Sequence, residues 1–242
     1  MRRMLVLFLF LFHFSFSQTV EVEYDLSIDM SGVNVVPFKH KFELINSQGK
    51  SLIKKHLVTK TSDKLLDKND QQVNVVKIGN DTTYIFKEFD SNKLFSEEKI
   101  FINMYKVKDD LNIFDWVIEN DSTTILGYKC YKAITKFRGR VFEAYFTIDI
   151  PISDGPGKYN GLPGLILKLS ILNSTSIYEI TAVRVGLKNE NTKLNNPFEG
   201  KKHIEYNDYR KKYIQKYNEM DSFNANQGVT VVKSGLEILF NE

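Results

Sequence analysis

Residues 151–168 read PISDGPGKYNGLPGLILK, and this stretch decides how the strands on either side of it are joined. It holds four of the thirteen glycines and three of the five prolines in the chain. Glycine permits backbone conformations closed to other residues, whereas proline fixes φ and removes a hydrogen-bond donor. We therefore expect a rigidly shaped loop. Turns are predicted at Asp154-Gly155 and Asn160-Gly161, leading into a strand that starts at Leu165.

The hexapeptide Gly161-Leu162-Pro163-Gly164-Leu165-Ile166 is predicted to be chiefly a folding element. Its two leucines and its isoleucine should be buried, and Gly161 or Gly164 should need a positive φ or close backbone contact. Function concentrates on loops that a rigid scaffold holds in place, so polar side chains in and beside the loop are candidate binding residues. These candidates are Arg140, Asp149, Asp154, Lys158 and Tyr159.

Alternation of apolar and polar residues predicts strands along most of the chain, most clearly over 19–30. Tight turns are expected at 47–50 and 137–140, and a hairpin is expected around 79–81. The further predicted strands are 38–44, 52–59, 73–78, 82–86, 98–106, 112–119, 124–136, 141–148, 164–172, 177–187, 229–232 and 236–240.

One helix is predicted where tyrosines and Met220 recur at spacings of three and four, from Tyr206 onward. About a dozen antiparallel strands with one late helix predict a mainly β fold. Sheets that long curl or close, so we expect one large, strongly curved sheet or an open barrel. The helix should lay its tyrosines on the sheet and cover the concave face. Binding of a partner or a membrane surface is the alternative role for this helix.

Residues 1–17 have the layout of a cleaved secretory signal. Arg2 and Arg3 precede an apolar run, and cleavage is predicted between Ser17 and Gln18. Spanning a bilayer takes about twenty apolar residues, roughly twice the length of this run. We therefore expect a protein exported to the periplasm or the medium that does not span the membrane, with a single β-rich domain over 18–242.

The composition argues against several functional classes. Residues 1–17 hold two of the 33 basic residues and none of the 30 acidic ones, so the predicted mature chain has a net charge of +1. That balance argues against a nucleic-acid-binding protein. The only cysteine, Cys130, is expected to be a buried small hydrophobe, with an intermolecular disulfide or a redox thiol as alternatives.

No cofactor or metal site is expected. Tyr159 stands where a phosphate-binding loop needs Ser or Thr, and Asn160 stands where the dinucleotide fingerprint needs glycine. The histidines outside the predicted signal, His40, His56 and His203, lack ligand-like spacing. His40 falls on the apolar side of its strand and is expected to be a core histidine with its hydrogen bonds satisfied.

Three blocks of the chain resemble the GLPGLI family of Bacteroidota envelope proteins, namely 126–130 (LGYKC), 138–140 (RGR) and 149–166, which ends in the hexapeptide. Two positions depart from the family pattern: Tyr145 stands where the family usually has Trp, and Gly157 stands where an aromatic residue commonly follows Gly-Pro. The resemblance implies a location in the cell envelope and supplies no catalytic residue. Thr82 and Ser122, each after an aspartate, resemble O-glycosylation acceptors of that phylum, although both also fit ordinary polar turns.

These features favour an exported, non-enzymatic binding or accessory protein whose partner is an apolar ligand or another envelope protein. One alternative is a hydrolase with a site near 149–166, in which Arg140, Asp149 and Asp154 converge. The other is a structural protein that docks its exposed loop onto an outer-membrane transporter.

Overall fold

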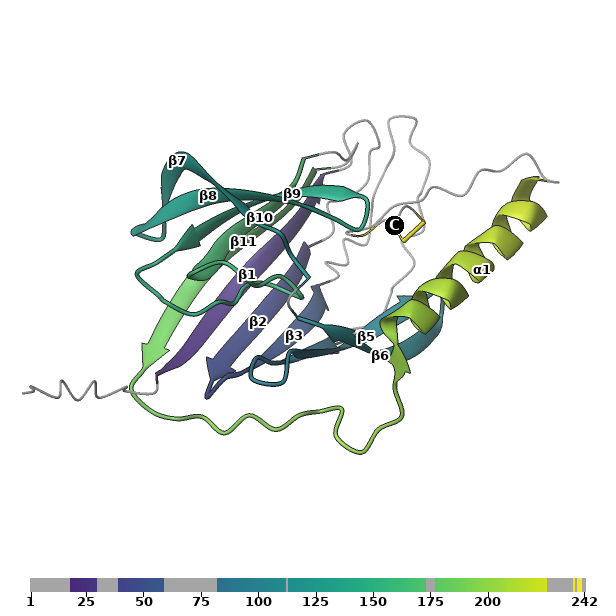
Figure 1. Ribbon diagram of the computed structural model, residues 1–242, viewed down its shortest axis with the longest axis horizontal. Coiled ribbons are helices and arrows are strands. Elements are labelled where there is room, and N and C mark those ends of the chain that lie inside the picture. The colour runs from purple at the N-terminus through teal and green to yellow at the C-terminus, as the bar shows by residue number, and fades with distance from the viewer. Residues whose placement is uncertain are drawn as a thin grey trace, which may run out of the picture.

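A computed structural model describes residues 18–29, 39–58, 82–111, 113–172, 177–225, 237 and 239–240. These residues form one twelve-stranded sheet and one helix (Figure 1). The elements are β1 (Thr19–Asp29), β2 (Lys39–Ser47), β3 (Lys50–Val58), β4 (Thr82–Glu88), β5 (Lys93–Ile100), β6 (Asn103–Asp110), β7 (Val117–Ile125), β8 (Tyr128–Phe137), β9 (Arg140–Thr147), β10 (Leu165–Ile171), β11 (Ile177–Lys188), β12 (Ile204–Glu205) and α1 (Tyr206–Ala225).

The sheet consists of two meanders joined along β1. Its strand order is β12-β6-β5-β4-β3-β2-β1-β11-β10-β9-β8-β7, and all neighbours are antiparallel except β12 and β6. β1 pairs with β11 along its whole length, which joins the first meander (β1 to β6) to the second (β7 to β11). The sheet is strongly curved and its two ends are not hydrogen-bonded to each other (Figure 1). The predicted fold class is therefore confirmed.

Two predicted strands contain turns that the sequence pattern did not reveal. The predicted strand 98–106 is a hairpin with its turn at Phe101-Ile102, and the predicted strand 124–136 is broken at Leu126-Gly127. An apolar pair such as Phe101-Ile102 carries no turn signal, because Gly, Asn and Asp dominate two-residue turns. The turns predicted at 47–50 and 137–140 are confirmed. Residues 73–81 and 229–232 lie outside the described residues, as do 236 and 238. The described residues of the predicted strand 236–240, namely 237, 239 and 240, lie in a bend and a turn, so that strand is not observed there.

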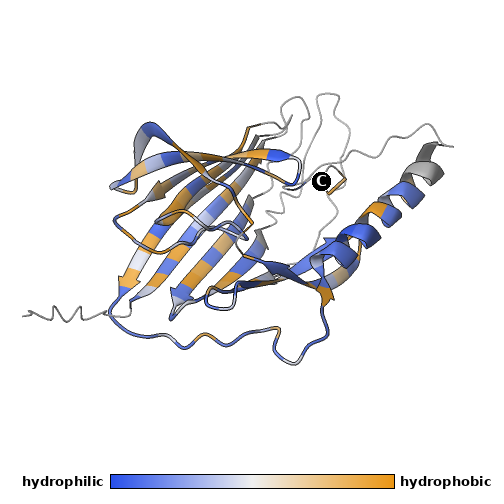
Figure 2. Cartoon of the chain, in the orientation of Figure 1, coloured by the Kyte–Doolittle hydropathy of each residue, from blue (hydrophilic) through white to orange (hydrophobic). Residues whose placement is uncertain are grey.

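The concave face of the sheet forms the core. Stripes of hydrophobic residues cross the strands in Figure 2, as expected where one face of each strand is buried. Val22, Leu44 and Ile53 face this side in register and are at most 2% exposed. The loop between β9 and β10 adds Tyr159 and Leu162 to the same core cluster, and its Asp154 bonds to Asn46 of β2 and Lys87 of β4. The loop, rather than the helix, therefore fills the centre of the concave face.

The helix covers only one end of that face. Tyr206 and Tyr209, in its first turns, pack with Ile100 and Val107 of the β5–β6 hairpin. Beyond those turns α1 follows the β5–β6 hairpin as far as its turn, where Tyr217 stacks on Phe101, at the end of the molecule formed by β5 and β6 (Figure 1). The tyrosine stripe does contact the sheet, but the expectation that the helix covers the concave face is wrong, because that space is already occupied by the loop.

Candidate functional site

A buried ion pair holds the loop to the first meander. Lys87 Nζ, from β4, lies 2.8 Å from Asp154 Oδ1 in the loop, and neither side chain has exposed surface. Lys87 also donates to the carbonyl oxygens of Gly155 (3.1 Å) and Tyr159 (2.9 Å), so its three protons each find an acceptor. Asn46 Nδ2, from β2, donates to Asp154 Oδ2 at 2.9 Å. We call Asn46, Lys87 and Asp154 the latch.

In the latch, Lys87 and Asp154 stabilise each other's charged forms. Burial lowers the pKa of Lys87, and the adjacent Asp154 opposes this by favouring the ammonium form. Asp154 Oδ1 also accepts from the backbone N–H of Gly155 at 2.8 Å. Nearby, the buried Tyr24 hydroxyl donates to the Ile166 carbonyl at 2.8 Å, and burial raises its pKa well above the usual value. Both oxygens of the Asp154 carboxylate are thus occupied by groups from the protein itself.

The hexapeptide is packed as predicted. Leu162, Leu165 and Ile166 are at most 1% exposed. Gly161 has φ +98°, which a residue with a side chain rarely adopts. A Cβ at position 164 would overlap the carbonyl oxygen of Thr147 and lie 3.1 Å from Ile148 Cα. Gly164 is therefore required by the close approach of two backbone segments.

A second charged cluster lies where the two ends of the curved sheet approach one another. Arg138, in the β8–β9 turn, donates to Asp109 of β6 at 2.6 Å and to Glu237 at 3.1 Å. Lys158, in the loop, lies 3.2 Å from Glu237 and 2.8 Å from Glu98 of β5. Positive and negative groups therefore alternate through the cluster, in the order Asp109, Arg138, Glu237, Lys158 and Glu98. We call this cluster the clasp; its members are Glu98, Asp109, Arg138, Lys158 and Glu237.

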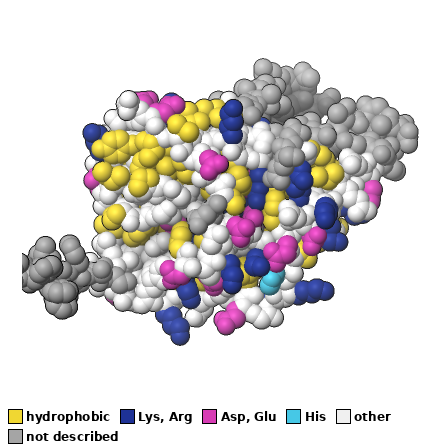
Figure 3. All heavy atoms as spheres, in the orientation of Figure 1, with side chains coloured by type: hydrophobic (Ala, Val, Ile, Leu, Met, Phe, Trp, Pro, Cys, Tyr) yellow, Lys and Arg dark blue, Asp and Glu magenta, His cyan; other side chains and the backbone are white. Residues whose placement is uncertain are grey.

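The clasp joins parts of the sheet that no strand pairing connects. The Arg138 guanidinium carbon lies 3.3 Å from the centre of the Tyr206 ring, which begins α1. Its side chain is 5% exposed, so the ion pairs and the ring contact are shielded from water. Figure 3 shows side chains of both charge signs interleaved over the right half of the face in view. The clasp thus links the β8–β9 turn and the loop to β5, β6, α1 and Glu237.

The clasp is poorly suited to moving protons. Burial alone would raise the pKa of Glu237, but Lys158 and Arg138 outweigh it and hold that pKa below its usual range. Burial likewise opposes the charge on Lys158, yet Glu237 and Glu98 raise the pKa of its ammonium group. An acid–base pair needs pKa values near the working pH, and these shifts move both groups away from it. The arrangement therefore favours a structural role for these side chains.

The structure does not bring the predicted site residues together. Asp154 is in the latch, Lys158 is in the clasp, and Tyr159 is 3% exposed in the core against Phe142. Asp149 is exposed in the turn after β9, at the opposite end of that strand from Arg140, and its charge contributes to the raised pKa of Cys130. Arg140 is buried at the start of β9. The convergence of Arg140, Asp149 and Asp154 that a hydrolase would require is not observed.

The predicted site residues omitted Asn46 and Lys87 of the latch and every member of the clasp except Lys158. Asn46 continues the inward parity of Phe42 and Leu44, and Lys87 continues that of Ile85. A lysine on the buried side of a strand signals a buried partner, and this signal was present in the sequence. Glu98, Asp109 and Glu237 gave no such signal. The partner of Glu98 is Lys158 and the partner of Asp109 and Glu237 is Arg138, and both cations lie far from these acids in the chain.

Cys130 is fully buried, as expected of a small hydrophobe. The expectation that His40 has its hydrogen bonds satisfied is not met, because its Nδ1 has no partner among the described residues. No group of three metal-ligating side chains occurs within the described ranges. Ser122 is exposed on β7, while Thr82 begins β4 and lies 3.0 Å from His56 Nδ1.

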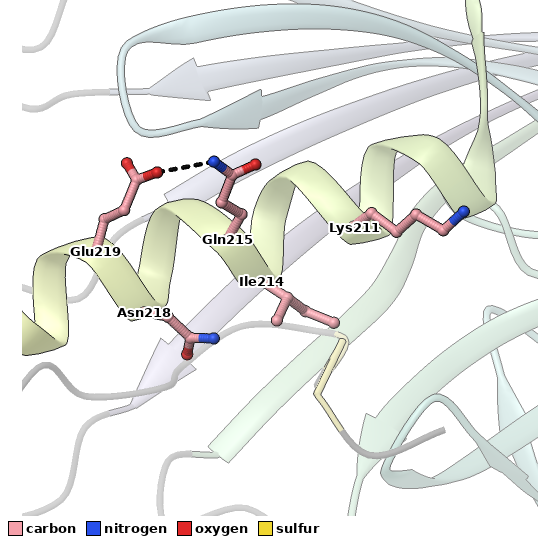
Figure 4. Close-up of a pocket in the computed structure, with 5 residues that line it drawn as sticks. All are labelled: Lys211, Ile214, Gln215, Asn218 and Glu219. Carbon is pink, nitrogen blue, oxygen red and sulfur yellow. Dashed lines mark hydrogen bonds between the residues drawn. The ribbon is translucent and has the colours of Figure 1, made fainter.

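The outer surface of α1 bears a shallow hollow. Figure 4 shows Lys211, Ile214, Gln215, Asn218 and Glu219 lining it, all from this one helix, with Gln215 donating to Glu219 at 2.9 Å. Mixed polar lining and wide exposure are unlike the enclosed apolar pockets that hold small ligands. Within the described part of the chain, no helix is long and apolar enough to cross a bilayer.

The fold is similar to part of a solved structure named PNGF-II. Two crystal forms of that protein, C2 and P21, match at 18% and 17% identity, each with a TM-score of 0.51. The match covers 83% of this chain and 34% of PNGF-II, so the chain spans about a third of the length of that protein. A LolA superfamily protein from Nitrosomonas europaea matches at 7% identity and a TM-score of 0.31, over 76% of this chain and 90% of the other.

No curated protein matches the sequence. One family does match, and it does so over the segment that carries the loop. Residues 135–168 include the Arg138 turn, β9 and the loop with Asp154 and Lys158. This segment matches the family described as "Protein of unknown function (Porph_ging)", the same Bacteroidota group as the GLPGLI family.

Proposed function

We propose that the protein is a non-enzymatic accessory protein of the cell envelope that acts by binding a partner at its outer surface. The observation that carries this proposal is the fate of the loop side chains. Asp154 and Lys158 are bound within the latch and the clasp, and Tyr159 is buried. A segment whose reactive groups are all engaged in holding the fold supports a scaffold better than a reaction site.

The same packing favours a surface partner over an enclosed apolar ligand. A carrier would hold its ligand on the concave face, and the loop fills that face with Tyr159 and Leu162. The exposed part of the loop is small and offers few groups for docking. Its exposed residues include Pro151, Ser153, Gly161 and Pro163, which offer little distinctive chemistry. The partner therefore belongs on another exposed surface.

The location in the envelope is part of this proposal. Its support is the signal-like sequence of residues 1–17, with cleavage proposed between Ser17 and Gln18 and a single domain over 18–242. Fractionation of the native organism, with mass spectrometry of the N-terminus, tests it. A chain that begins at Gln18 in the envelope fraction is expected. An uncleaved chain in the cytoplasm would contradict the proposed location.

Binding is tested by affinity purification of the protein from its own envelope after mild cross-linking. A partner that is retained by a loop-surface variant, Ser153→Ala, is the expected result. A substrate turnover that disappears in Lys158→Met, with the fold preserved by circular dichroism, would overturn the non-enzymatic proposal. Repeated isolation of the protein without any partner would count against the accessory role.

A further inference from the structure

The end of the molecule opposite β7 combines exposed apolar side chains with positive charge. It is formed by the turn of the β5–β6 hairpin and the flank of α1 that lies beside it. Phe101 of the hairpin stacks on Tyr217 of the helix with ring centres 5.1 Å apart, which fixes the two elements side by side. We call this surface the hairpin–helix end; it comprises Phe101, Ile102, Met104, Lys212, Lys216, Tyr217 and Met220.

The apolar side chains of this end are exposed at a place where polar residues are the rule. Ile102 is 94% exposed, and its neighbours Phe101 and Met104 are 40% and 41% exposed. Phe101 has φ +54°, a conformation that bulky residues rarely adopt. A two-residue turn normally uses Asn or Gly there. The chain thus tolerates an unfavourable turn that presents Phe and Ile to the outside, which indicates that something covers them.

Positive charge surrounds these side chains. Residues 99–108 hold three lysines and no acidic residue, and residues 205–219 hold four basic and three acidic residues. Glu97 and Glu98 face Lys106 and Tyr105 across the hairpin and reduce the +4 of these two segments to +2, which is still above the +1 of the whole predicted mature chain. Lys212, Lys216 and Met220 follow each other at spacings of four along one flank of α1. Lys216 also interacts with Tyr105 of β6, which places this flank beside the hairpin.

We infer that the hairpin–helix end docks on an anionic lipid surface. This inference rests on the proposed accessory role and names its partner. Exposed aliphatic side chains at a tip, surrounded by lysines and backed by tyrosines, match the layers of a bilayer interface, where acyl chains underlie anionic headgroups. Nucleic acid would use the cations and aromatic rings but not Ile102 and Met104. An acidic protein would satisfy the charge without needing an isoleucine that is almost fully exposed.

Vesicle flotation with the purified exported protein tests the inference. We expect binding to phosphatidylglycerol-containing vesicles, weaker binding as salt is raised, and little binding to pure phosphatidylcholine. Ile102→Asp should lower the partition coefficient about tenfold or more, as loss of one buried isoleucine side chain implies. The pair Lys212→Gln/Lys216→Gln should lower it by roughly tenfold, since each lysine near the surface contributes separately.

Matched controls distinguish docking from general effects. Val117→Asp changes an exposed apolar residue on β7, and Lys41→Gln/Lys136→Gln removes two exposed lysines elsewhere. Both should bind as the unaltered protein does. An environment-sensitive dye on Ile102→Cys should shift to the blue with anionic vesicles, and the same dye on Val117→Cys should not. The native Cys130 is buried and should not be labelled.

Wild-type protein that fails to bind vesicles, or Ile102→Asp protein that binds as well as wild type, would overturn the inference. If a protein partner then still co-purifies from the envelope, only the lipid assignment falls and the accessory role stands. If that partner is lost in Ile102→Asp, the hairpin–helix end is a protein interface instead. Loss of both vesicle and partner binding in the wild type would remove the proposed function as well.

Discussion

Lys87 and Asp154 form an ion pair of 2.8 Å in which neither side chain has any exposed surface, although 67 residues separate them in the chain. The pair connects β4 to the loop between β9 and β10, across the inside of the curved sheet. Burying two charges is costly, and their attraction offsets that cost only when every remaining hydrogen-bonding position is filled. Asn46 and the carbonyl oxygens of Gly155 and Tyr159 fill those positions.

We predict that Asp154→Ala lowers the free energy of unfolding by about 3–5 kcal/mol, because it leaves the Lys87 ammonium buried without a counter-charge. Urea denaturation followed by circular dichroism measures this. The matched variant Lys87→Met/Asp154→Leu removes both charges and should be distinctly more stable than Asp154→Ala. Equal stability of the two variants would show that the pair itself is not what holds the loop.

The clasp should also stabilise the folded protein, because its charges are largely buried and paired. Arg138→Met removes the partner of Asp109 and Glu237 and the cation over the Tyr206 ring. We expect a loss of about 2–4 kcal/mol in the free energy of unfolding, with Arg138→Lys intermediate because lysine lacks the planar fork. The exposed pair Lys216–Glu219 serves as a control, since Lys216→Met should change stability by less than about 1 kcal/mol.

Sequence periodicity predicted the sheet because several strands alternate cleanly, as β1 does from Thr19 to Asp29. It also predicted the buried hexapeptide, since Leu165 and Ile166 run straight into β10. Periodicity is a local signal. It therefore carried no information on the turn at Phe101-Ile102, because these residues have no turn preference. Nor did it indicate that the β8–β9 turn lies close to the β5–β6 hairpin.

The two charged clusters escaped prediction for the same reason. Asp154 was selected as a binding residue from its position in the loop, but its role depends on Lys87, which the fold brings to it. Lys158 likewise depends on Glu98 and on Glu237, which lies 79 residues further along the chain. Pairings of this kind are set by tertiary packing. A single sequence therefore shows which charged residues are present but not which of them pair.

Acid should weaken the fold partly through His40. Burial, aided by the nearby Lys55, lowers the pKa of His40 to about 4, against an ordinary value of about 6.5. Between these values the unfolded chain binds more protons than the folded one, so the free energy of unfolding falls as the pH drops through this window. His40→Gln should flatten that dependence. Urea titrations at several pH values measure the slope, and an unchanged slope would contradict the assignment.

The thiol of Cys130 should be inert in the folded protein. Burial raises its pKa to about 11, so little thiolate forms at neutral pH, and the side chain has no exposed surface. We expect negligible reaction with Ellman's reagent under native conditions and complete reaction in urea. Rapid labelling of the native protein would instead indicate a redox-active thiol, and a disulfide-linked dimer on non-reducing gels would indicate an intermolecular disulfide.

The central claim is that the loop is a folding element and that binding occurs elsewhere, and Gly164→Val tests it most directly. Overlap with Thr147 should cost about 1–3 kcal/mol and lower the melting midpoint by several degrees, whereas Gly186→Val, in an open part of β11, should not. The measurement is a thermal melt paired with vesicle and partner binding below the midpoint. A lower midpoint with unchanged binding is predicted; an unchanged midpoint with lost binding would contradict the account.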